Sequence, residues 1–231
     1  MKFFGLITAR SGSKGIPGKN IIKLNDKTLI QIVAEALVNS GSVSQSLIST
    51  DSQVYGTIAS HCGVAFPWIR PQSLAIDKAA VNDVIRHVIT TEQLVRKGFT
   101  HIVLLQPSSP LTLETDIQAA VKLILGGKYD SVISATKFED KSLNYIFDND
   151  KGYCRWIQKQ SRAFGNRQEV SLLYKRCGNV YCFNINKFIK LNTLACDRCG
   201  FIEIPQERSV CLDELKDIQE LKMFGDVTYE G

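Results

Sequence analysis

Short apolar runs and amphipathic stretches alternate along the first 136 residues of this chain. The apolar runs, which predict buried strands, lie at residues 3–7, 46–50, 64–69, 101–106 and 131–136. Helical periodicity fills the intervals, with stretches expected to end near Gly41, Gly63 and Gly98 and another at 113–125. Strands separated by helices predict an α/β fold with a doubly wound, mostly parallel sheet covered on both faces.

One predicted helix start has a local signal of its own. Thr28 and Gln31 have the spacing of a capping box, which favours a helix beginning directly after Thr28 and stopping at Gly41. A second amphipathic stretch, at 214–224, follows Asp213 near the end of the chain. From its position directly before this stretch, Asp213 is a candidate N-cap for that helix.

The composition is that of an ordinary globular protein. The chain has 231 residues, 44% of them hydrophobic and 22% charged. This length suits a single α/β domain over residues 1–231 with a substantial core. The first apolar run is too short for a signal peptide or a membrane span, and Arg10 and Lys14 follow it. We therefore expect no membrane partner.

Cysteine usage points to a reducing compartment. The seven cysteines are odd in number and scattered, which suits the cytoplasm better than a disulfide framework. Cys196 and Cys199, with Cys177 and Cys182 upstream, leave a zinc site as a weaker alternative, because their spacing is irregular. The three histidines lie in separate segments, so packing or surface positions are expected for them. We predict a cytoplasmic protein.

The loop after the first predicted strand carries the strongest chemical signal. Its glycines and cations are Gly12, Gly15, Gly18, Arg10, Lys14 and Lys19. Glycines permit close backbone approach and positive φ, and three cations in one short loop suit a polyphosphate. The spacing fits neither the P-loop pattern nor G-x-G-x-x-G. Side-chain charge and loop amides are therefore expected to hold the phosphates.

The predicted topology gathers this loop with other polar segments. Ligands of open α/β sheets bind beyond the carboxyl ends of the strands. The loop at 10–20, Asp51 and the segment at 106–110 each follow a predicted strand. We expect all three to converge at one edge of the sheet.

The excess positive charge lies in one segment. Residues 151–176 hold seven basic residues and one acid, so they carry +6, whereas the whole chain carries +5. The same segment contains Tyr153, Trp156, Phe164 and Tyr174. A basic and aromatic mixture suits nucleic acid, and it also suits a solvated hairpin.

The sequence from Ala9 to Asn20 resembles the signature of the sugar-activating cytidylyltransferases, above all the CMP-sialic acid (acylneuraminate) synthetases, which read A-R-x-x-S-K-G-h-P-x-K-N with h apolar. Other segments resemble the family in the same order, namely 48–52, 70–71, 104–111, 130–136, 167–169, 178–181 and 209–213. The resemblance runs end to end and is strongest over the first 136 residues.

This resemblance implies a Rossmann-like nucleotidyltransferase fold and a specific reaction. CTP and a 2-keto-3-deoxy nonulosonic acid of the sialic type would give the CMP-sugar and pyrophosphate, with Mg²⁺ as cofactor. In the resembling family an insertion, here at 138–176, protrudes, supports a homodimer and reaches over the partner's sugar site. An acidic sugar needs positive charge there, so we favour this role for the basic segment and expect no nucleic-acid partner.

The resemblance also assigns residues. The nucleotide-binding residues are expected to be Ala9, Arg10, Ser13, Lys14, Lys19, Asn20 and Arg70. The sugar-binding residues are expected to be Gln106, Arg167 and Lys175. Arg10, Lys19 and Asp213 are the expected catalytic residues, because the two cations would stabilise the leaving pyrophosphate and Asp213 would bind Mg²⁺ through its carboxylate oxygens.

Three residues depart from the family pattern. Cys211 stands where the family has an acid two positions before Asp213, and a thiol suits Mg²⁺ poorly. Cys177 replaces an asparagine, and Val81 replaces a serine. These changes remove hydrogen-bonding groups where the family binds the acceptor sugar. We therefore expect a less polar or differently N-acylated sugar to be preferred over N-acetylneuraminate.

Two other functions stay open at this point. One is a cytidylyltransferase for another acidic sugar, such as legionaminic acid, pseudaminic acid or a 3-deoxy-octulosonic acid. The other is a weakened homologue that binds nucleotide and has a regulatory role.

Overall fold

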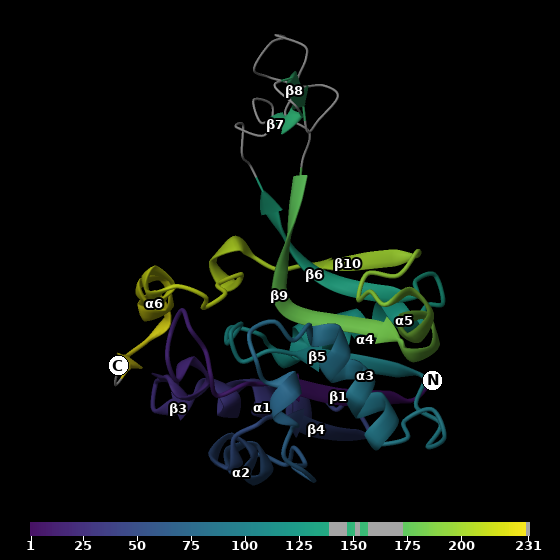
Figure 1. Cartoon of the computed structure of the whole chain (residues 1–231), viewed down its shortest axis with the longest axis horizontal. Coiled ribbons are helices and arrows are strands. Elements are labelled where there is room, and N and C mark those ends of the chain that lie inside the picture. The colour runs from purple at the N-terminus through teal and green to yellow at the C-terminus, as the bar shows by residue number, and fades with distance from the viewer. Residues whose placement is uncertain (139–146, 151–152, 157–172, 230–231) are drawn as a thin grey trace.

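The central feature of the fold is a six-stranded sheet (Figure 1). The computed structural model describes residues 1–138, 147–150, 153–156 and 173–229. Across the sheet the strand order is β10 (Cys199–Glu203), β6 (Ser131–Phe138), β9 (Leu173–Asn184), β5 (His101–Leu105), β1 (Phe3–Thr8) and β4 (Gln45–Ser49).

Five of the six strands point the same way. β1 pairs in parallel with β4 and β5, and β6 pairs in parallel with β10. β9 lies antiparallel between β5 and β6, with a register shift near Ile133 and Ala135. The predicted mostly parallel sheet is confirmed. The antiparallel strand was not predicted from the sequence.

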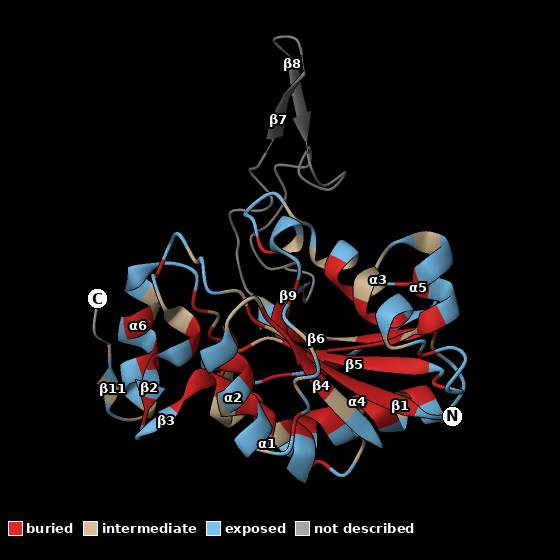
Figure 2. Cartoon of the chain, turned by 60° about the horizontal axis from the view of Figure 1, so that its bottom comes forward, coloured by how far each residue is buried: buried red, intermediate tan, exposed pale blue. Residues whose placement is uncertain are grey.

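Helices cover both faces of this sheet. α1 (Leu29–Asn39), α2 (Gln53–His61) and α4 (Glu114–Leu125) share one apolar cluster with the sheet. α3 (Val81–Thr91) and α5 (Ile185–Leu191) form a second cluster on the other face. Figure 2 shows the buried strands between these two helical layers. The doubly wound arrangement is therefore confirmed. Within the described part of the chain, no helix is long and apolar enough to cross a membrane.

The predicted helix boundaries mostly hold. Thr28 caps α1 through a capping box, in which its Oγ1 accepts the N–H of Gln31 and the Gln31 side chain accepts the N–H of Thr28. The glycines at the expected stops, Gly41, Gly63 and Gly98, all have positive φ, which residues without a Cβ adopt freely.

Two local predictions were wrong. Helix α3 ends at Thr91 rather than running to residue 97, because Gln93 takes a φ of 51° and the chain turns to bury Leu94 completely. The predicted strand at 64–69 is reduced to one bridge between Leu47 and Ala65.

Smaller elements surround the sheet. The short helical turns are η1 (Lys19–Ile21), η2 (Gln72–Leu74), η5 (Gln206–Arg208) and η6 (Lys222–Phe224). β2 (Lys23–Leu24), β3 (Lys27–Thr28) and β11 (Val227–Thr228) form a three-stranded antiparallel sheet. β7 (Phe147–Asp150) pairs antiparallel with β8 (Tyr153–Trp156), and Figure 1 draws this pair apart from the central sheet. Most of the expected insertion at 138–176 lies outside the described residues.

The C-terminal segment packs against the loop that follows β1. A third apolar cluster joins Ile16 of that loop to Leu212 and to Ile218 of α6 (Leu215–Leu221). The ammonium of Lys19 donates to the backbone oxygen of Leu212 at 2.9 Å. The first and last parts of the chain thus meet at one place beside the sheet.

The proposed N-cap role of Asp213 was wrong. The N-cap residue of α6 is Glu214. The carboxylate of Asp217 accepts the backbone N–H of both Asp213 and Glu214 at 2.7 Å. This internal acid satisfies the helix start and leaves the side chain of Asp213 free to face Lys19.

A substitution at Gly15 tests the contact between the loop after β1 and the C-terminal segment. A Cβ at Gly15 would lie 2.1 Å from the backbone oxygen of Asp213, so one backbone would have to move. We expect Gly15→Ala to lower the free energy of unfolding by about 1–3 kcal/mol, measured by chemical denaturation. Gly12→Ala is the matched control, because no described residue brings a heavy atom within 4 Å of its Cβ position. Equal stability of the two variants would contradict this account.

Candidate active site

A pocket lies at the carboxyl ends of β1 and β5. It encloses about 270 Å³, which is at the small end for ligand pockets and suits a ligand that extends beyond it. The lining residues are Thr8, Ala9, Arg10, Ser13, Lys19, Asn20, Arg70, Leu74, Ile76, Asp77, Ala79, Val81, Val84, Gln106, Pro107 and Ser108. The predicted convergence of the loop and the segment after β5 is therefore found at this edge.

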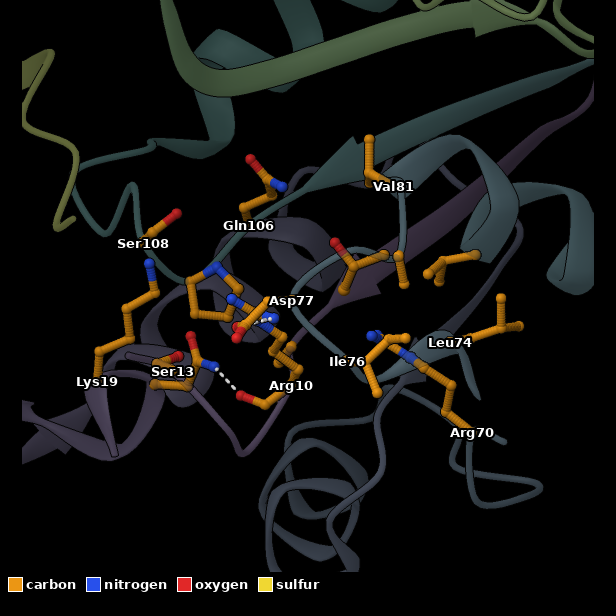
Figure 3. Close-up of a pocket in the computed structure, with 16 residues that line it drawn as sticks. Arg10, Ser13, Lys19, Arg70, Leu74, Ile76, Asp77, Val81, Gln106 and Ser108 are labelled. Atoms are coloured by element: carbon orange, nitrogen blue, oxygen red, sulfur yellow. Dashed lines mark hydrogen bonds and ion pairs between the residues drawn. The ribbon is translucent and has the colours of Figure 1, made fainter. Parts of the chain in front are cut away.

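Hydrogen bonds to neighbouring segments fix the shape of the loop. The backbone N–H and hydroxyl of Ser11 both donate to the carboxylate of Asp51, at 2.8 and 2.5 Å. The buried amide of Asn20 donates to the backbone oxygen of Arg10 at 2.9 Å and so closes the loop on itself (Figure 3). Asp51, expected at this edge from the sequence, thus acts on the loop from the end of β4.

A buried cation forms one wall of the pocket. The Arg70 side chain donates to the hydroxyl and to the backbone oxygen of Ser49. Burial lowers the pKa of Arg70 to about 10, so it still carries its charge at neutral pH. A buried charge is costly unless it is compensated, and a polar or anionic ligand in the pocket would compensate this one.

Lys19 connects the pocket with Asp213. Its ammonium lies 3.1 Å from Asp213 Oδ1 and donates to Leu212 at the same time. Its side chain is 20% exposed, whereas that of Asp213 is 71% exposed and stands outside the pocket lining. The cation is thus held inside while the carboxylate faces the solvent beside it.

The residues around Asp213 offer limited support for a metal. The thiol of Cys211 lies 3.6 Å from Asp213 Oδ2, and burial raises its pKa. Among the residues that the structure describes, no three His, Cys, Asp or Glu side chains are grouped as a metal site. Asp213 can supply one hard oxygen ligand to Mg²⁺, and the remaining ligands would have to come from phosphate and water.

Asp77 is a charged pocket residue that was not predicted from the sequence. Its carboxylate forms ion pairs with Arg10 Nη1 and Lys14 Nζ, each at 2.7 Å. The neighbouring Lys14 and Arg10 side chains hold the pKa of Asp77 below its usual range. Nothing local in the sequence shows that Asp77 meets a loop more than 60 residues earlier.

The expected sugar-binding residues are only partly brought together. Gln106 lines the pocket, next to Ser108. Lys175 is exposed on β9 and lies outside the lining, and Arg167 lies outside the described residues. Lys14 also lies outside the lining, but its ammonium pairs with Asp77, which lines the pocket.

Two of the three departures from the family pattern, Val81 and Cys177, occupy different environments. Val81 lines the pocket at the start of α3, and Figure 3 draws it on the side of Gln106, apart from Leu74 and Ile76. Cys177 is buried in the apolar cluster with α1 and α4, so it belongs to the core rather than to the pocket wall. The expectation that Cys177 meets the sugar therefore has no support in its position.

Several curated proteins are similar to this chain. An N-acylneuraminate cytidylyltransferase of Escherichia coli O18:K1:H7 is 39% identical over 59% of this chain and 32% of that protein. A CMP-N,N'-diacetyllegionaminic acid synthase of Legionella pneumophila is 32% identical over 83% of this chain and 75% of that protein. A pseudaminic acid cytidylyltransferase of Campylobacter jejuni is 24% identical over 100% of this chain and 99% of that protein.

The chain is shorter than some of these relatives. It spans about a third of the Escherichia coli protein and about half of the N-acylneuraminate cytidylyltransferases of Streptococcus agalactiae. Among solved structures, a CMP:2-keto-3-deoxy-manno-octonic acid synthetase complexed with CTP superposes with a TM-score of 0.69 at 14% identity, over 96% of this chain and 98% of that one. This likeness shows a shared fold.

The match to a family is broader than any of these pairwise similarities. The profile described as cytidylyltransferase matches residues 4–224, which include the loop after β1, the pocket and the segment around Asp213. The chain therefore belongs to the cytidylyltransferase family.

Proposed function

We propose that this protein is a cytoplasmic enzyme that transfers CMP from CTP to an acidic nonulosonic sugar and releases pyrophosphate. The observation that carries the proposal is the meeting of Arg10, Lys19 and the buried Arg70 in one pocket with Gln106. The names of its relatives support the substrate class, since they are described as acting on N-acylneuraminic, pseudaminic and legionaminic acids.

The pocket divides naturally between the parts of a nucleotide. Arg10 and Lys19 would meet the triphosphate, where two cations compensate its negative charge. Asn20 and Arg70 would contact the nucleoside with their hydrogen-bonding groups, and the apolar wall of Leu74, Ile76 and Ala79 suits the faces of a base or ribose. Ala9 and Ser13 also line the pocket.

The chemistry then requires mainly position and charge. The anomeric hydroxyl of the sugar, oriented by Gln106, attacks the α-phosphorus in line. A bond forms between the sugar oxygen and phosphorus, and the hydroxyl proton passes to water. The bond from phosphorus to the bridging oxygen breaks, and pyrophosphate leaves with that electron pair. Arg10 and Lys19 stabilise the charge that develops on the leaving group.

The acceptor sugar is the less defined substrate. Val81 presents an isopropyl group to the pocket, whereas the family pattern has a hydroxyl there. A site without that hydroxyl gains nothing from a substrate group that would pair with it. We propose that a less polar or differently N-acylated nonulosonic acid, such as legionaminic acid, is preferred over N-acetylneuraminate.

The reaction is tested by pyrophosphate release from CTP with a panel of nonulosonic and octulosonic acids. We expect release with at least one nonulosonic acid. Lys19→Ala should lower kcat/KM, with a loss of about 2–4 kcal/mol of transition-state stabilisation, because a preorganised cation is removed. Lys23→Ala is the control, since Lys23 is exposed on β2 outside the pocket. Unchanged turnover in Lys19→Ala would refute the assignment of Lys19, and CTP binding without release from any sugar would favour the regulatory alternative.

Mg²⁺ is part of the proposal. Neutralisation of charge on phosphate oxygens is the chemistry that this ion supplies when bound, and Asp213 would be its ligand from the described residues. We expect calorimetry to show weak Mg²⁺ binding without nucleotide and stronger binding with CTP, and Asp213→Asn should weaken the latter. Tight Mg²⁺ binding to the free protein would contradict this assignment, because one carboxylate cannot hold the ion strongly.

A homodimer is also proposed. Tyr174 of β9, near the end of the basic segment, packs against Phe201 of β10 with ring centroids 4.6 Å apart and ring planes tilted by 48°, and both side chains are exposed. Exposed aromatic side chains are enriched at interfaces between subunits. We expect sedimentation equilibrium to give the mass of a dimer at micromolar concentration. A monomer at all working concentrations would refute it.

A further inference from the structure

An acidic side chain already lies on the cations that would bind phosphate. Asp77 points into the pocket beside Arg10, among the residues that line it (Figure 3). Its two carboxylate oxygens lie 2.7 Å from different loop cations, Oδ1 from Arg10 and Oδ2 from Lys14. One carboxylate thus bridges two cations in the way that a phosphate group would.

The other cations of the site are also engaged inside the protein. Lys19 donates to Leu212 and pairs with Asp213, while Arg70 donates to Ser49. Asp77 is the carboxylate that pairs with both Arg10 and Lys14 on the solvent-facing side of the loop. A polyphosphate that uses Arg10 has to share or replace this carboxylate, because two anions close to one cation repel each other.

The Asp77 ion pairs are of a kind that a ligand can replace. The side chains of Arg10 and Asp77 are about one-third exposed and that of Lys14 is 83% exposed. Ion pairs with this exposure contribute little, because water and salt screen them. A triphosphate carries several charges where Asp77 carries one, so it competes favourably for the same nitrogens.

Displacement of Asp77 would move a wall of the pocket. Asp77 lies in the irregular segment between η2 and α3, which also supplies Ile76 and Ala79 to the lining. Short connecting segments rearrange more easily than the sheet that carries them. A change at the phosphate position would therefore reach the region proposed to hold the nucleoside.

We propose that Asp77 is an internal competitor for the polyphosphate: it occupies a phosphate position on Arg10 and Lys14 in the free protein, gives way when CTP binds, and returns as pyrophosphate leaves. This inference rests on the proposed function for the identity of the ligand. Asp77 weakens the binding of substrate and product alike, and its return limits how long pyrophosphate stays bound.

The test is calorimetric titration of wild-type protein and Asp77→Asn with pyrophosphate, CTP and cytidine at one fixed ionic strength. Asp77→Asn should bind pyrophosphate and CTP about five- to tenfold more tightly, the gain expected when two exposed ion pairs no longer compete. Cytidine lacks phosphate, so its affinity should stay unchanged. Asp83→Asn is the matched control, because it removes the same charge from an exposed position on α3, outside the pocket lining.

The outcomes separate this inference from the proposed reaction. Equal or weaker pyrophosphate binding by Asp77→Asn, in a wild-type protein that forms CMP-sugar, overturns the inference alone and makes Asp77 a residue that orients Arg10. Tighter pyrophosphate binding by Asp77→Asn without CMP-sugar formation by the wild type supports the inference and overturns the reaction. Asp77→Ser provides a second variant with the same expected result if the asparagine variant does not fold.

Discussion

The packing of the C-terminal segment against the loop after β1 is the constraint on which the site depends. Gly15 leaves no room for a side chain beside the backbone of Asp213, and Ile16 is fully buried next to Leu212. Lys19 adds a hydrogen bond to the same segment. A loop with three cations repels itself, so its shape has to come from contacts of this kind, which do not depend on a bound anion.

The same constraint links the two ends of the chain to the sheet between them. Asp51 holds the beginning of the loop at the end of β4, and the segment before α6 is tied to the end of β5 by the hydrogen bond from Leu212 N–H to the backbone oxygen of Ser108. The loop is therefore supported from three strand ends at once. Groups fixed before the ligand arrives need little reorganisation during the reaction, which is how positioned charge contributes to catalysis.

Three cations of the free site are paired with two carboxylates of the protein itself. Arg10 and Lys14 pair with Asp77, and Lys19 pairs with Asp213, so these ion pairs restrain the three cations without a ligand. Arg70 differs because its burial makes the charge costly, which lowers its pKa.

Much of this arrangement could be predicted from the sequence because its signals are local. The apolar run before the loop, the capping box at Thr28 and the loop motif each depend on residues close in the chain. The order of these elements then predicted that the site lies at the carboxyl ends of the strands. The antiparallel placement of β9 and the meeting of Asp77 with Arg10 are contacts between distant segments. The early end of α3 depends on the burial of Leu94, which periodicity alone does not show.

The central claim is that CTP binds in this pocket with its triphosphate on the cations of one loop. The most direct test is a crystal structure of the protein with CTP and Mg²⁺. The account predicts triphosphate oxygens within hydrogen-bonding distance of Arg10 and Lys19, and the cytidine beside Asn20 and Arg70. A triphosphate bound elsewhere, or one that leaves Arg10 and Lys19 untouched, would contradict it.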